Sequence, residues 1–431
     1  MTEPDVEGAP PPEPSLLESL TPVAPDWAAG EAAQARLAGW RTATGTLADV
    51  ARWVGTVRPD GTPFHRIRLI AFAADHGVAD GADEARALLA GEGALALLAE
   101  RAGVSIRLID AGLAGDPLPG DVSARRVRAG SPALHHEDPL TPEQVDAALD
   151  LGARVADEEV DAGADLVIPV VLTESALIPA TVIIGSLCDV EPVRALGYDA
   201  HVPDAVWIER CAAVRDGMRR VSTAAATLAT RRLLAIGGGA DLAAAAGFLV
   251  RTAARRTPAL LDGVGAAAAA LVARALAFEA PRWWYAPHGS GRAGEKQAFS
   301  MLSLEPAVNL GVRLGDGAGA LLALPVLTAA IELTRTAPQR VEETPDEVEV
   351  TVDPGDEIGG VGGYDAGPRA PEADVPIVQP EDVDPAVIEP LDPADPLAVD
   401  PEPSLDPTPL AANPAAPTDA VRRAGDAPSG G

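Results

Sequence analysis

The sequence predicts an α/β protein with a doubly wound parallel sheet and a small accessory subdomain. Short apolar runs typical of buried strands alternate with longer segments of helical periodicity. Most of these apolar runs end in glycine or in a polar residue. A body of about 300 residues is long enough to bury the core of one such domain. In sheets of this kind, ligands bind at the carboxyl ends of the strands.

The elements are expected in the following order: helix 31–55, strand 67–73, helix 82–102, strand 105–109, helix 142–161, strand 164–171, helix 204–230, helix 240–255, strand 258–262, helix 265–278 and strand 282–286. Each strand is joined to the next by at least one helix, which is the pattern of a parallel sheet. Polar residues close four of the strands and should therefore lie along one edge of the sheet. These residues are Asp75 with His76, Asp110, Asp262 and His288.

The last 90 residues differ in composition from the rest of the chain. From Glu342 to Gly431 there are 22 acidic residues, three arginines and 17 of the 41 prolines. Proline removes backbone donors and like charges repel one another, so this stretch cannot form a packed core. We therefore expect a disordered segment over 1–30, a folded domain over 31–340 and a disordered acidic tail over 341–431. The tail is also a candidate binding region for a protein partner.

The composition argues against several classes of protein. A formal net charge of −31 would repel phosphate, so nucleic acid is not an expected partner. No apolar stretch has the length and the flanks of a membrane-spanning helix, and the N-terminus lacks the pattern of a secretion signal. We therefore expect a cytoplasmic protein. The six histidines are scattered and the two cysteines lack metal-ligand spacing, so we predict no metal and no cofactor.

Two segments combine glycine with ionisable side chains. The first closes strand 67–73 with Asp75, His76 and Gly77, which could bind a ligand or could simply cap the next helix. The second is a glycine-rich turn that contains Gly238 and precedes Asp241 in a helix. Such a turn exposes N–H groups that can receive phosphate or carboxylate. The alternative is that its glycines only permit a tight bend.

Segment 303–327 carries the clearest signal for catalysis. Gly315 and Gly317 flank Asp316, and an apolar helix follows. The glycines let a substrate approach the backbone closely. A partly desolvated pocket would raise the pKa of the Asp316 carboxyl toward that of a useful base. The alternative is that Asp316 is an ordinary helix N-cap. The turn at Asp262 and Gly263 is explained more readily by packing alone.

Six stretches, taken in order, resemble the nicotinate-nucleotide:dimethylbenzimidazole phosphoribosyltransferase family. They are FAADHGVA (72–79), LIDAGL (108–113), GGADLAAAAGFL (238–249), RRTPALLDGVGAAAAALVA (255–273), HGSGRAGE (288–295) and LEPAVNLGVRLGDGAGALLALPVL (304–327). The resemblance covers roughly residues 45–335. It is carried by the joint order and spacing of the stretches.

The resemblance implies a parallel-sheet large domain, a small helical subdomain built from both ends of the chain, and a homodimer. It also implies a reaction in which phosphoribose moves from nicotinate mononucleotide to an aromatic base, a benzimidazole. A carboxylate takes the proton of that base, and Asp316 stands where the family has a glutamate. The substrate-binding positions carried over by resemblance are Asp75, His76, Gly77, Gly238, Asp241, Asp262, Gly263, His288, Ser290, Gly315 and Gly317.

Several ligand loops depart from the pattern of the family. Asp316 is one methylene shorter than glutamate, and the serine/tyrosine/proline segment that follows the family's D-H-G-V is missing. The glycine-rich turn expected after strand 164–171 is replaced by a stretch that contains Glu174, and a third loop contains Asp199. Carboxylates in these loops would repel a phosphate. Two hypotheses stay open: a phosphoribosyltransferase, or a catalytically degenerate relative that acts as a binding or regulatory protein.

Overall fold

The computed structural model describes residues 21–40, 44–77, 81–314 and 316–338. The chain divides into two units, residues 1–346 and 347–431, and every described residue belongs to the first. The predicted tail over 341–431 and most of the predicted segment over 1–30 lie outside the described residues. Helix α1 begins at Trp27, a few residues before the predicted start of the folded domain.

Five parallel strands form one sheet in the order β2-β1-β3-β4-β5. Alternate residues of β1 point to opposite faces, so Ile70 and Phe72 join one apolar core while Leu69 and Ala71 join the other. This arrangement confirms the doubly wound α/β fold. The strands are β1 (Ile67–Ala74), β2 (Ser105–Gly112), β3 (Leu166–Val171), β4 (Ala259–Leu260) and β5 (Trp284–Tyr285).

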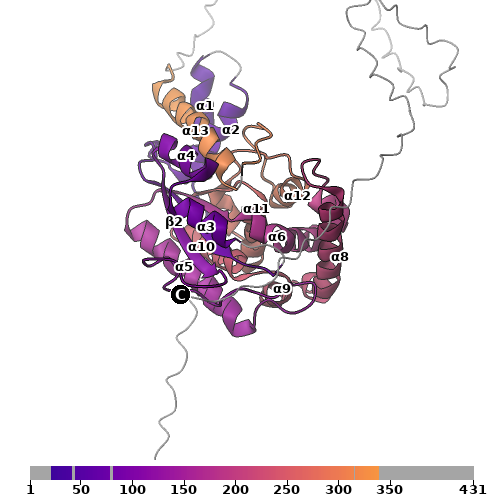
Figure 1. The fold of residues 1–431 in the computed structure, drawn as a ribbon. Coiled ribbons are helices and arrows are strands. Elements are labelled where there is room, and N and C mark those ends of the chain that lie inside the picture. The colour runs from indigo at the N-terminus through magenta and orange to yellow at the C-terminus, as the bar shows by residue number, and fades with distance from the viewer. Residues whose placement is uncertain (1–20, 41–43, 78–80, 315, 339–431) are drawn as a thin grey trace, which may run out of the picture. The chain divides into compact units, whose positions relative to one another are not determined.

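Helices cover both faces of the sheet (Figure 1). One core contains residues of α5, α6, α10, α11 and α12, and the other contains residues of α2, α3, α4 and α13. The helices that form the α/β body are α3 (Ala82–Leu89), α4 (Gly93–Ala102), α5 (Pro142–Asp161), α6 (Thr173–Leu187), α7 (Pro192–Leu196), α8 (Asp204–Ala226), α9 (Thr230–Gly237), α10 (Ala240–Ala254), α11 (Val264–Leu276) and α12 (Ala293–Leu302), with a short 3-10 turn η2 (Ala280–Trp283) before β5.

Helices α5 and α10 approach each other closely because small residues face each other. A Cβ on Gly152 would lie 1.8 Å from the carbonyl oxygen of Ala244, and a Cβ on Gly247 would lie 2.1 Å from that of Leu149. Residues 240–250 of α10 are fully buried, which explains the alanine-rich sequence of this helix.

The small helical subdomain is built from both ends of the described chain, as predicted. It combines α1 (Trp27–Leu37), the 3-10 turn η1 (Ala38–Trp40), α2 (Thr46–Val57) and α13 (Ala318–Thr336), which lie together in Figure 1. The indole N–H of Trp40 donates to the carbonyl of Leu333 at 3.1 Å. Among the described helices, α13 alone is long and apolar enough to cross a membrane, but half of it is buried in the fold, as in a core helix.

Two predicted helices are divided in two, and a third ends earlier than predicted. The predicted helix 31–55 breaks before Gly45, which has φ 50°, and the predicted helix 82–102 breaks at Gly91 and Gly93, which have φ 73° and 89°. The predicted helix 204–230 ends before Leu228, which has φ 51°. A positive φ cannot continue an α-helix, and glycine adopts it without steric cost. Helix α6 was not predicted, because segment 172–178 was interpreted as a ligand loop.

Candidate active site

Asp316 is buried, with only 5% of its surface exposed, and its carboxylate lies against the turn that follows β4. The N–H of Gly265 donates to its Oδ2 at 2.9 Å. Gly263 has φ 99°, and a Cβ at this position would lie 2.0 Å from Oδ1 of Asp316. Gly317, with φ 84°, begins α13 directly after Asp316 and packs against Val170 of β3. The glycines therefore make the space that the carboxylate occupies.

A buried histidine–aspartate pair lies next to the first turn of α13. His288 Nδ1 is 2.9 Å from Asp262 Oδ1, and Asp262 Oδ2 accepts the N–H of Ala320 at 3.1 Å. A Cβ on Gly319 would lie 2.0 Å from Nδ1 of His288, so the ring is packed against this turn. No described residue bonds to Nε2 of His288. The pair thus links the ends of β4 and β5 to the helix that carries Asp316 at its start.

Glu295, which the sequence analysis did not select, organises the same region. It is 1% exposed. Its Oε1 accepts the N–H of Gly263 at 2.8 Å, and its Oε2 accepts the N–H and the Oγ–H of Ser290 at 2.7 and 2.6 Å. Burial raises the pKa of Glu295 and the negative charge of Asp262 raises it further, while the hydrogen bond from Ser290 lowers it. An acidic residue in the first turn of α12, soon after a glycine-rich stretch, was the available signal.

A cavity of about 20 Å³ lies beside the Asp316 carboxylate. A cavity needs about 10–15 Å³ to contain one water molecule, so this one is large enough for a water and too small for an aromatic ring. Arg313 Nε and Nη2 lie 3.4 Å from the carbonyl oxygens of Ser290 and Gly291. Arg292 and Arg313, which both line the cavity, thus place positive charge beside the carboxylates. The lining residues are Asp262, Gly263, Ser290, Arg292, Val312, Arg313 and Asp316.

A second buried pair joins His76 to Asp241 at the start of α10. Nε2 of His76 is 2.9 Å from Oδ2 of Asp241, whose Oδ1 accepts the N–H of Leu242 at 2.8 Å. A Cβ on Gly239 would lie 2.1 Å from Cε1 of His76, so the glycine-rich turn packs directly on the ring. The N–H of Gly238 donates to the carbonyl of Leu234 at 3.0 Å.

Asp75 connects the ends of the first two strands. Its Oδ1 accepts the N–H of Gly81 at 2.5 Å and its Oδ2 accepts the N–H of Ala114 at 2.6 Å. Gly77, with φ 67°, packs against the backbone of Ala133. Gly81 is the N-cap residue of α3, so this bond fixes the chain just before the helix but does not cap its first turn.

The structure thus separates the predicted site residues into groups. Around the small cavity it gathers Asp262, Gly263, His288, Ser290, Asp316 and Gly317. His76 and Asp241 form the second pair, and Gly238 lies in the turn before Asp241. Asp75 and Gly77 lie in the turn after β1 and stabilise it. Gly315 lies outside the described residues.

Helix α6 occupies the place where the resemblance implies a glycine-rich phosphate loop. It begins at Thr173, two residues after β3 ends at Val171. Glu174 lies in its first turn, 3.7 Å from Arg210. Burial raises the pKa of Glu84, and the charge of Glu174 raises it further. The N-terminus of this helix therefore already faces carboxylates of the protein itself.

Comparison with known proteins gives consistent matches. Residues 23–342 match a family model described as phosphoribosyltransferase. A Mycobacterium tuberculosis protein named nicotinate-nucleotide–dimethylbenzimidazole phosphoribosyltransferase is 43% identical over 322 residues, which are 71% of this chain and 89% of that protein. A Streptomyces avermitilis protein of the same name is 41% identical over 309 residues, 68% and 82% of the two chains. The crystal structure of CobT from Thermus thermophilus superposes with a TM-score of 0.66 at 24% identity, covering 72% of this chain and 96% of that one, and supports the fold.

Proposed function

This chain belongs to the phosphoribosyltransferase family, and we propose that it transfers phosphoribose from nicotinate mononucleotide to a benzimidazole base. The observation that carries the proposal is the carboxylate of Asp316, buried at the start of α13 and oriented by the N–H of Gly265. A desolvated carboxylate is suited to accept a proton from a nitrogen heterocycle. The product would belong to cobalamin biosynthesis. We expect the enzyme to act in the cytoplasm and to form a homodimer.

In the proposed reaction, the unprotonated ring nitrogen of the benzimidazole attacks the anomeric carbon of the nucleotide. The bond from that carbon to the pyridine nitrogen breaks, and nicotinate leaves with the bonding electrons. Asp316 takes the proton from the other ring nitrogen. Arg292 and Arg313 line the cavity and would balance the negative charge of the nucleotide. Asp262, Gly263, His288, Ser290 and Gly317 would act around this centre. Asp75, His76, Gly77, Gly238 and Asp241, also predicted to bind substrate, lie in the other groups described above.

One observation favours a second candidate, a degenerate family member that binds a ligand or partner without turnover. The cavity beside Asp316 holds about 20 Å³, too little for an aromatic base. Helix α6 with Glu174 also replaces the expected phosphate loop. A transferase would have to open this region when its substrates bind.

The deciding experiment combines calorimetry with a turnover assay on the full chain, using nicotinate mononucleotide and dimethylbenzimidazole. A transferase should bind both, and Asp316→Asn should lower turnover by about 10²-fold or more while leaving nucleotide binding intact. Glu332→Gln makes the same change from carboxylate to amide on the exposed face of α13 and is the matched control. It should leave turnover and nucleotide binding unchanged. Absence of both turnover and saturable nucleotide binding in the unaltered chain would favour the binding protein instead.

A further inference from the structure

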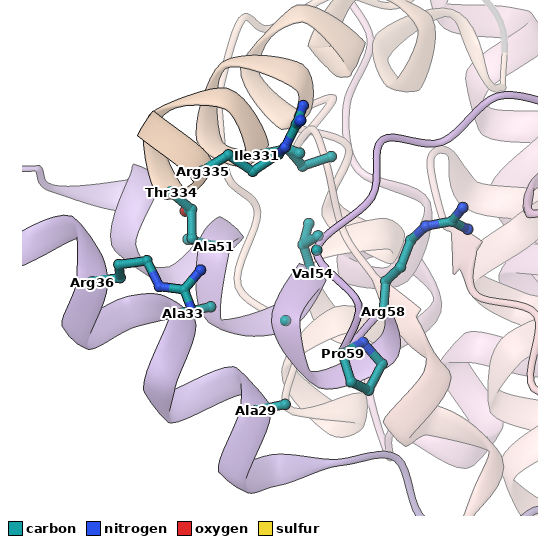
Figure 2. A pocket seen from close by; sticks show the side chains of 12 residues that line it. Ala29, Ala33, Arg36, Ala51, Val54, Arg58, Pro59, Ile331, Thr334 and Arg335 are labelled. Atoms are coloured by element: carbon teal, nitrogen blue, oxygen red, sulfur yellow. The ribbon is translucent and has the colours of Figure 1, made fainter. Parts of the chain in front are cut away.

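The helical subdomain contains a hollow that the proposed reaction does not use. It has a cavity volume of about 50 Å³ and lies between α1, α2 and α13 (Figure 2). Its floor is apolar, formed by Ala29, Ala33, Ala51, Val54 and Ile331. Its lining also contains three arginines, one from each of α1 and α13 and one directly after α2. The hollow thus combines a small apolar floor with a positively charged rim.

Two of the three arginines lack a charge partner within the described part of the chain. Arg58 is 3.3 Å from Asp165 and is therefore neutralised. Arg36 and Arg335 are exposed and form no ion pair with any residue in 21–40, 44–77, 81–314 or 316–338. Figure 2 shows them reaching the hollow from different helices. The protein has a net charge of −31, so two arginines without an ion-pair partner are a local exception. Their positive charge favours an acidic segment as the occupant of the hollow.

The path of the chain after α13 leads past this hollow. Thr334 and Arg335, in the last turn of α13, line it. A Cβ on Gly39 would lie 2.3 Å from the carbonyl oxygen of Pro338, so the chain crosses the end of α1 close to Arg36. Gln339 and Arg340 follow Pro338, and the next residues are Val341-Glu-Glu-Thr-Pro-Asp346. Five residues extend to at most about 17 Å, which is enough to return from Pro338 to the rim.

We propose that residues 341–346 dock into this hollow of their own chain. Val341 would cover part of the apolar floor, and Glu342 and Glu343 would pair with Arg36 and Arg335. The contact would fix the first residues of the acidic segment to the helical subdomain. This inference does not depend on the proposed transferase activity, since it concerns a different part of the surface.

The test is the mobility of a nitroxide label on Thr344→Cys in the full chain, with Cys188→Ser and Cys211→Ser removing the two free thiols. The label should be immobilised at low salt. The double change Arg36→Glu with Arg335→Glu should lower the docked-to-free ratio about tenfold, because each exposed ion pair is worth a few-fold in an equilibrium constant. One molar salt should release the label in the same way.

Charge exchange distinguishes docking from a general loss of folding. Glu342→Arg with Glu343→Arg should also free the label, and combining these changes with the two arginine reversals should restore its immobilisation. A second label on Ala394→Cys must not respond to the arginine changes. The proposal is wrong if the Thr344→Cys label is equally mobile in all variants. It is also wrong if immobilisation is lost when the total protein concentration is lowered, since the segment would then bind a second copy.

Discussion

Gly263→Ala is the sharpest test of how the candidate active site is built. The backbone of Gly263 has φ 99° and ψ 167°, a region that is essentially restricted to glycine and costs other residues about 1–3 kcal/mol. The added Cβ would lie 2.0 Å from Oδ1 and 2.2 Å from Cγ of Asp316. Ordinary contacts begin at 3.4 Å, so the carboxylate would have to move by more than 1 Å. A displacement of that size lowers a catalytic rate by about 10²-fold.

Gly291→Ala is the matched control, because it separates backbone strain from the steric clash. Gly291 also has a positive φ, 73°, and lies beside the same cavity, but its added Cβ would meet only Nη2 of Arg313 at 3.9 Å. Both variants should lose thermal stability, whereas only Gly263→Ala should lose phosphoribosyl transfer by about 10²-fold. Steady-state turnover and thermal unfolding on the same preparations would measure both effects. A folded Gly263→Ala protein with the activity of Gly291→Ala would refute the inferred position of the Asp316 carboxylate.

Three further changes test the surrounding structure. Glu295→Gln places an amide where three N–H or O–H groups donate, and should lower turnover. Burial raises the pKa of Glu295. The contribution of Glu295 to the free energy of unfolding is therefore complete below about pH 4.5 and is lost as the pH rises through the pKa of the folded state. Urea unfolding should therefore show the unaltered chain losing stability relative to Glu295→Gln as pH rises, and an unchanged difference would contradict this. Asp110→Asn removes the charge of a fully buried carboxylate that pairs with Arg126 at 2.6 Å. Because Arg126 is only partly buried, the cost in the same assay should be about 3 kcal/mol, at the lower end of the range for buried pairs. Gly152→Ala would place a Cβ 1.8 Å from the carbonyl of Ala244, so thermal unfolding should show a large loss; a neutral effect would mean that α5 and α10 are farther apart.

The sequence predicted the fold well where local and long-range signals agreed. Helix α5 has the predicted bounds, because Thr141 and Gln144 form a capping box and Pro142 begins the helix. The order of strands and helices likewise followed from periodicity. The breaks at Gly45 and Gly91 were missed, since the apolar periodicity continues across them and only the backbone reveals the positive φ.

Helix α6 shows how a family resemblance can mislead. Segment 172–178 was interpreted as an altered ligand loop, because it stands where the family has a glycine-rich turn, and no helix was predicted for it. Its own residues favour a helix, since they include no glycine and Glu174 suits a first helical turn. These local signals were not used to predict an element here, so α6 was missed.

The candidate site could be predicted only in part, because its pairings are tertiary. The glycine pattern around Asp316 identified the carboxylate and its neighbour Gly317. Nothing in the sequence indicates that His288 pairs with Asp262 while His76 pairs with Asp241, since these contacts join segments 26 and 165 residues apart. Glu295 was missed although it stands in the first turn of α12, because its bond to Gly263 joins segments 32 residues apart.

The contacts around the cavity indicate which group must move if the protein is a transferase. The three buried carboxylates are each fixed by a backbone N–H: Gly265 donates to Asp316, Gly263 to Glu295 and Ala320 to Asp262. These bonds measure 2.8–3.1 Å, and breaking one would leave a buried charge less well satisfied. The two contacts of Arg313 are longer, at 3.4 Å, and go to carbonyl oxygens near the surface. Because its contacts are the weaker ones, Arg313 is the lining residue that we expect to move if an aromatic base is to enter beside Asp316.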